Sequence, residues 1–225
     1  MAIAYDTSVT QQTSDGSGST LTFSFTTTGT NRYLLVGCLN TGYPTVTMTS
    51  VTYGGVAMTQ IGLVDVGNVS GTQVEYLYGL ANPASGANNI VLTASGTCTI
   101  AAVAASYTGA QQTTALEASG TATGASGTGT KSITTITNNA WLVGHARGQS
   151  NASASTSTTF RPADNAGLAM MDSNADKTPA GSYSLNFTTS GNNNWGILVA
   201  SIAPYVAPSG PVGIKSWNGL TVRAG

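Results

Sequence analysis

His145 is the only histidine among the 225 residues, so a hydrolase of the Ser-His-Asp kind would have to use it as general base. It lies in WLVGHARG, where alternation places Trp141, Val143 and His145 on one face of a strand. The chain contains no G-x-S-x-G nucleophile elbow. We therefore expect a partly buried strand histidine rather than a catalytic one.

A zinc site would need thiolate and imidazole ligands at close spacing, and the two cysteines do not provide it. Cys38 and Cys98 stand 60 residues apart, and His145 follows Cys98 after 47. Each cysteine lies in an apparent strand, and the amino terminus has no basic and apolar leader. Buried free thiols are therefore favoured over a disulfide.

Acidic side chains gather in ADNAGLAMMDSNAD, which carries Asp164, Asp172 and Asp176. A calcium loop needs oxygen ligands at alternate positions and more charge over fewer residues, so we expect a solvated loop. Paired carboxylates of a glycosidase would meet only in space, and no pattern points to them. The sequence predicts no catalytic residue, no metal ligand and no cofactor site.

A glycine-rich stretch, GASGTGTKS at 124–132, is close in composition to a phosphate-binding loop. Thr130 stands between Gly129 and Lys131, which breaks the G-K-[ST] order, and no flanking strand and helix are visible. We interpret SGTATGASGTGT at 119–130 as a linker or long loop.

Charge is sparse, with 7% charged residues and a formal net charge of -1. The seven Lys and Arg are scattered with no two adjacent, which argues against a nucleic-acid partner. The longest apolar run is far shorter than the roughly 20 residues of a membrane-spanning helix. We expect a soluble protein, made in a cytoplasm without secretion, that binds neither nucleic acid nor membrane.

The elements that would position these residues are short strands separated by Gly, Asn, Ser and Pro. Leu21, Phe23 and Phe25 alternate with hydroxyl residues, and NRYLLVGCLN follows as a continuously apolar strand. A hairpin is predicted at Gly54-Gly55. Further strands are predicted at 73–80, 89–94, 98–107, 131–137, 141–146, 182–188 and 195–203. AQQTTALEA at 110–118 is the one candidate for a helical turn.

Internal echoes suggest two matching halves. LTASG at 92–96 resembles FTTSG at 187–191, and TNRYLLVGC at 30–38 resembles TNNAWLVGH at 137–145. Two halves of four or five strands predict an all-β fold, a two-sheet β-sandwich of jelly-roll type over residues 1–204. Five aromatic residues could line a sugar-binding face, but at least half of them are expected in the core, because they lie on strands in phase with Val and Leu: Tyr43, Tyr53, Tyr76, Tyr78 and Trp195.

The last residues have a different character. After a Pro/Gly/Ser spacer at 205–212, the segment 213–225 contains IKSW-NG-LTVR, in which Asn218-Gly219 is suited to a type I′ hairpin turn. So short a hairpin is barely stable alone and leaves apolar side chains bare, so it needs another subunit or a larger particle. The predicted docking contacts are Ile214, Trp217, Asn218, Gly219, Leu220 and Val222.

The strings VTYGGVAMTQIG and VEYLYGLANPASGANNIVLTASGTCTIAAVAASYTGA together resemble a β-sandwich domain of tailed-bacteriophage virion proteins. IKSWNGL is similar to short C-terminal repeats of phage tail and fibre proteins. The resemblance covers about 31–204 and the tag, and it supplies no catalytic residue. It implies a component of the virion surface: a capsid decoration protein, a head fibre or a tail appendage. Its implied partners are other capsid or tail proteins and further copies of itself, with a trimer as one candidate.

The main alternative is a receptor- or carbohydrate-binding adhesin module of a phage fibre. Its loops around Tyr43, Asn68, Asn151 and 192–194 would bind a host-surface glycan. A polysaccharide depolymerase is a third class, against which the lack of clustered carboxylates argues.

Overall fold

A computed structural model describes residues 1–42, 44–67, 73–125, 127–148, 153–155, 157–161, 168–189 and 194–207. Within these ranges the chain forms seventeen β-strands and no helix, so the predicted all-β class is confirmed. None of these ranges contains a helix that could cross a membrane.

The first half of the chain forms two antiparallel sheets. Inner sheet 1 contains, in spatial order, β1 (Ala4–Thr13), β9 (Ile100–Thr108), β3 (Tyr33–Thr41), β7 (Gln73–Ala81) and β6 (Thr59–Asp65). Outer sheet 1 contains, in spatial order, β2 (Thr20–Thr27), β8 (Gly86–Ala94), β4 (Met48–Tyr53) and β5 (Val56–Ala57). Together they make the first sandwich.

The second half repeats this plan. Inner sheet 2 contains, in spatial order, β10 (Leu116–Gly124), β17 (Trp195–Ile202), β12 (Trp141–Gly148), β15 (Leu168–Asp172) and β14 (Thr159–Phe160). Outer sheet 2 contains β11 (Thr128–Thr134), β16 (Ser182–Thr188) and β13 (Ser153–Ala154). Strands that carry the sequence echoes, β3 with β12 and β8 with β16, occupy equivalent places in the two halves.

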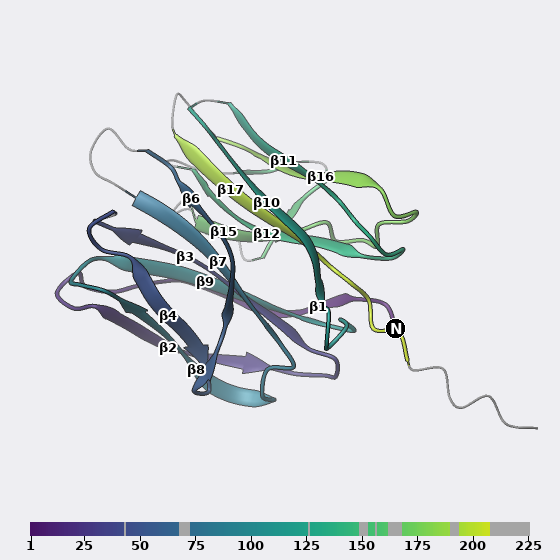
Figure 1. Ribbon diagram of the computed structural model, residues 1–225, viewed down its shortest axis with the longest axis horizontal. Helices are drawn as coiled ribbons and strands as arrows, with labels where there is room; N and C mark the ends of the chain where they lie inside the picture. Colours follow the sequence, from purple (N-terminus) through teal and green to yellow (C-terminus); the bar gives the residue numbers. More distant parts are fainter. Residues whose placement is uncertain are drawn as a thin grey trace, which may run out of the picture.

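The four sheets stack as layers (Figure 1). The sequence predicts only two sheets. One apolar cluster lies between outer and inner sheet 1 and includes Phe23 and Val36. A second lies between the two inner sheets and includes Leu35 and Met170, and a third lies between inner and outer sheet 2. The inner sheets are therefore covered on both faces, and the two sandwiches share one interface.

Residue pattern explains which strands lie inside. In β2 every second residue is buried, as the alternation of its apolar and hydroxyl residues predicts. β9 and β17 are apolar at nearly every position, and both are buried along almost their whole length. Continuous apolar runs are typical of strands that are covered on both faces.

The predicted glycine hairpin is confirmed. Gly54 and Gly55 adopt φ values of 55° and 81° between β4 and β5, a conformation that glycine adopts without steric cost. The chain then passes through the buried Met58 into β6, which belongs to the other sheet of the sandwich.

Three local predictions are wrong. Residues 110–118 form no helix; Ala110 makes a bridge with Pro204, and β10 begins at Leu116. Residues 119–130 are not a linker, because β10 extends to Gly124 and β11 begins at Thr128. The predicted solvated loop around Asp172 contains β15, whose five residues are all buried.

The assignment of aromatic and sulfur side chains to the core is confirmed for the described residues. Tyr53, Tyr76, Tyr78 and Trp195 are at most 7% exposed, whereas Tyr43 lies outside the described ranges. Cys38 and Cys98 are buried free thiols.

Candidate functional site

The residues predicted to dock on a partner are not among those that the structure describes. Ile214, Trp217, Asn218, Gly219, Leu220 and Val222 all follow Ala207, the last described residue. The assembly hairpin and most of the spacer therefore stay predictions, and the structure bears on them only through the point where the described chain ends.

That point lies on the surface beside the amino terminus, at what we call the base end (Figure 1). The amide of Tyr205 donates to the carbonyl of Gly109 at 2.7 Å, and the ammonium group of Met1 donates to the carbonyl of Tyr205 at 2.8 Å. Val206, the next residue, is 69% exposed. The residues beyond 207 thus start from an anchored and accessible position.

The opposite end, which we call the tip end, is reached along β17. This strand begins at Trp195, paired with Gly124 and Gly148, and it ends at Ile202, paired with Leu116 and Trp141. The first sandwich has the same orientation, because Asp65 and Gly67 line one cavity with Thr123 and Asn194 at the tip end. The two ends therefore belong to the whole four-layer body.

Charged groups are buried where the two sandwiches meet. Glu75 on β7 and His145 on β12 face each other across the inner sheets, with 3.4 Å between Oε2 and Nε2 and no exposed side-chain surface. A Cβ on Gly37 would overlap the His145 ring, and one on Gly196 would lie 2.7 Å from Oε1 of Glu75. The two glycines thus make room for the pair. The predicted strand position of His145 is confirmed, but its burial is complete rather than partial.

Burial dominates the protonation of this pair. It raises the pKa of Glu75 from 4.5 to about 8, against a smaller lowering by the charge of Arg147. It lowers the pKa of His145 from 6.5 to about 3, and the Arg147 charge lowers it further. The folded protein therefore holds one proton on the pair across the range between these two values.

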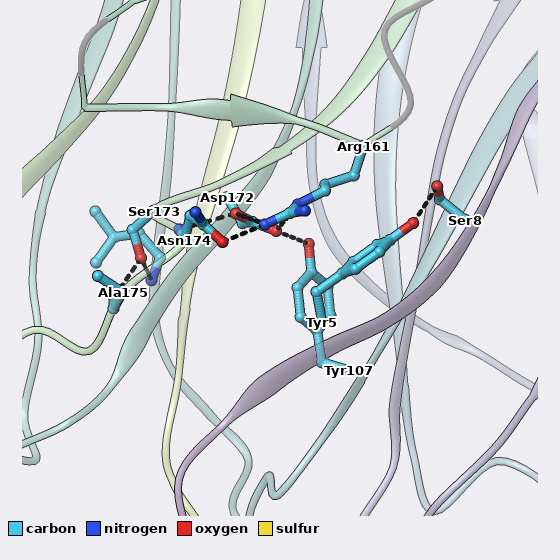
Figure 2. Close-up of polar contacts among 9 residues, drawn as sticks. Tyr5, Ser8, Tyr107, Arg161, Asp172, Ser173, Asn174 and Ala175 are labelled. Carbon is cyan, nitrogen blue, oxygen red and sulfur yellow. Dashed lines mark hydrogen bonds and ion pairs between the residues drawn. The ribbon is translucent and has the colours of Figure 1, made fainter.

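A second buried polar contact crosses the same interface (Figure 2). The Asp172 carboxylate, fully buried on β15, accepts from Nε of Arg161 at 2.9 Å and from the hydroxyl of Tyr107 at 3.1 Å. The Arg161 guanidinium lies 4.3 Å from the ring centre of Tyr5. Because Tyr5 and Tyr107 come from the first sandwich, this cluster fixes the two sandwiches relative to each other.

Burial is also the main cause that raises the pKa of Tyr107, to which the adjacent Asp172 charge contributes, so this hydroxyl stays a proton donor. Sequence reasoning missed both contacts, because Glu75 meets His145, and Asp172 meets Tyr107, from the opposite half of the chain. The single acidic residue within each largely apolar strand, Glu75 in β7 and Asp172 in β15, is the available signal, because a buried charge needs a partner.

These contacts can hold the sheets in register, because they link the two inner sheets. Comparisons with family models, with curated proteins and with solved structures each found no match for this chain.

Proposed function

We propose that the protein is an accessory structural component of a bacteriophage virion, a capsid decoration, a head fibre or a tail appendage, with no catalytic role. Its four-layer body provides a rigid, weakly charged surface. Its C-terminal tag provides the contact to a neighbouring subunit or to the particle.

The observation that carries this proposal is that the described strands and core of the body end before the tag begins. Among the described residues, every strand of the four sheets ends before residue 203, and the buried core includes both ends of the last strand, β17. The tag follows from an anchored, exposed point at the base end. A segment that contributes nothing to the described core and whose sequence includes Ile214, Trp217 and Leu220 is suited to contact with a partner.

The fold part of the proposal is that each sandwich is a jelly roll. In the first half β1 to β4 alternate between the two sheets, β5 stays in the outer sheet, β6 and β7 lie in the inner sheet, and β8 and β9 alternate again, which gives β1-β9-β3-β7 facing β2-β8-β4-β5. The second half follows the same order with a shorter outer sheet. This order of four strands facing four supports the assignment, since a jelly roll places eight strands in two facing sheets with two Greek keys.

The separation of the two ends supports a role in assembly. Both described termini lie at the base end, and β17 places the tip end a full strand length away. A component attached through its base would present its tip loops outward.

A glycan-binding adhesin is the second candidate, and the tip end is the observation that favours it. Thr41 pairs with Gln73, and Gly148 pairs with Trp195, so the flanks of four predicted glycan loops lie at this end. Of the residues named for those loops, only Asn194 is described. Specific binding of the purified chain on a glycan array would favour this candidate.

Replacing Trp217 by alanine is expected to remove most of the protein from purified virions, because an indole supplies much of the anchoring energy in a small interface. The midpoint of thermal unfolding should stay within about 1 °C of the wild type, as expected for a change outside the core. The measurement is the number of copies per virion by quantitative mass spectrometry.

The matched control is Ile136→Ala, which truncates a side chain that is 68% exposed on the body. This variant should keep its place on the virion. Equal occupancy for Trp217→Ala and the wild type would contradict the proposal.

A further inference from the structure

A groove runs along the body where β6 and β10 lie side by side, one from each sandwich. At the base end a cavity of about 340 Å³ is lined by Tyr33 and Ile61 from the first sandwich and Leu116 from the second. A narrow cavity of about 90 Å³ continues it past Gly62 and Thr121. At the tip end a cavity of about 430 Å³ follows, the one lined by Asp65, Thr123 and Asn194.

Both strands that border this groove are the last strands of their sheets. In the strand orders of the described residues, β6 and β10 each pair with one neighbour only, β7 and β17. Each strand therefore has a free row of backbone N–H and C=O groups, which is the template for adding another strand.

We propose that this groove receives the tag of a second copy, with residues 214–217 added as a strand beside β6 and β10. The inference rests on the proposed function, which makes the tag a docking element, and it names the surface that receives it. Asn218-Gly219 then turns the chain so that 220–223 lie outside the added strand.

The chain beyond the described residues has the length for this contact. Eighteen residues follow Ala207, and the six at 208–213 span about 20 Å when extended. The described chain ends at the base end, close to the cavity that Leu116 lines, because the amide of Ala203 donates to the carbonyl of Ala115 at 2.8 Å. A tag that starts there can reach an adjacent molecule.

Strand direction favours a second copy over the same chain. β6 and β10 both run from the base end to the tip end, so a chain's own tag, entering at the base end, would run parallel to them. All thirteen strand pairs of the described residues are antiparallel. A neighbour of opposite orientation would send its tag in from the tip end, and a twofold pair would fill both grooves.

Side-chain chemistry agrees with this direction. A tag that enters at the tip end brings Lys215 close to Asp65, an acidic residue that lines the tip cavity. Leu220 and Val222 come back over the groove, which is lined by apolar Ile61 and Leu116. The parallel arrangement would separate Lys215 from Asp65 by most of the length of β6.

Cysteine pairs on separate chains test the inference. One chain carries Thr123→Cys at the tip end or Thr59→Cys at the base end, and a second, size-tagged chain carries Ser216→Cys. Thr59 and Thr123 are exposed, and the native Cys38 and Cys98 are buried, so mild oxidation should act on the introduced thiols. Thermal unfolding of each variant checks that the body is folded.

We expect a shift from monomer to mixed disulfide dimer for Thr123→Cys with Ser216→Cys, and little for Thr59→Cys, since a disulfide requires Cα atoms within about 7 Å. The inference would be overturned by cross-linking to Thr59→Cys alone or by no cross-linking. It would also be overturned if a chain that carries both Thr123→Cys and Ser216→Cys formed a disulfide only within itself. If no cross-link forms but the Trp217→Ala variant is still missing from purified virions, the tag docks on another virion protein. In that case this inference fails and the proposed function stands.

Discussion

The Glu75→Gln variant is expected to gain stability over the wild type as the pH rises from 4.5 to 8, by about 5 kcal/mol in total. Burial raises the pKa of Glu75 in the folded protein to about 8, whereas the unfolded chain releases this proton near 4.5. The contribution of Glu75 to wild-type stability therefore falls through that window, and a neutral glutamine makes no such pH-dependent contribution. Urea unfolding at a series of pH values measures the difference.

His145→Gln is the matched control with the opposite sign. Because the pKa of His145 is lowered from 6.5 to about 3, the wild type loses stability as the pH falls through that window. The glutamine variant should gain relative to it there. In the wild type, the combined contribution of Glu75 and His145 to stability should be constant between pH 4.5 and 6.5. In that range the folded and the unfolded protein each hold one titratable proton on the pair. Parallel curves for all three proteins would contradict this account.

Asp172→Ala is expected to lower the free energy of unfolding by about 3–5 kcal/mol, the usual cost of removing one partner of a buried ion pair. The substitution leaves the Tyr107 hydroxyl buried without its acceptor and the Arg161 guanidinium, 18% exposed, without its counterion. Chemical denaturation at pH 7 gives the value, and a single transition would show that both sandwiches unfold together.

Asp15→Ala serves as the comparison, because Asp15 is an exposed residue whose carboxylate caps Ser17 in a turn. Its effect should be much smaller. Equal losses for the two variants would mean that the Asp172 cluster does not hold the interface.

The sequence predicts strands well where residue pattern and environment agree. The alternation of Leu21, Phe23 and Phe25 predicts a half-buried strand, and β2 is one. The continuous apolar run NRYLLVGCLN predicts a more deeply buried strand, and β3 is buried at all but its last residue; β9, β12 and β17 have similar apolar runs. Such runs also indicate a body of more than two layers, because a strand whose sheet is covered on both faces shows no alternation of polar and apolar residues.

Other elements could not be predicted because composition and structure disagree. β10 has the sequence LEASGTATG, which is as rich in Gly, Ser and Thr as a linker, and pairing with β17 makes it a strand. β15 is short and flanked by polar residues, and its strand state depends on pairing with β12. Pairing between distant segments overrides local propensity in both cases.

The candidate site could also be predicted only in part. The histidine was placed on its strand, whereas Glu75 reaches it only because the two halves stack through their inner sheets. The matching halves could be inferred from LTASG and FTTSG, but no short echo says which faces of the two halves meet.

Removing residues 208–225 tests most directly whether a self-sufficient body carries a separate assembly tag. We predict that the chain ending at residue 207 unfolds at the same midpoint as the full chain and sediments as a monomer, while the full chain self-associates. Loss of the folded body on truncation, or equal self-association of both chains, would contradict the account.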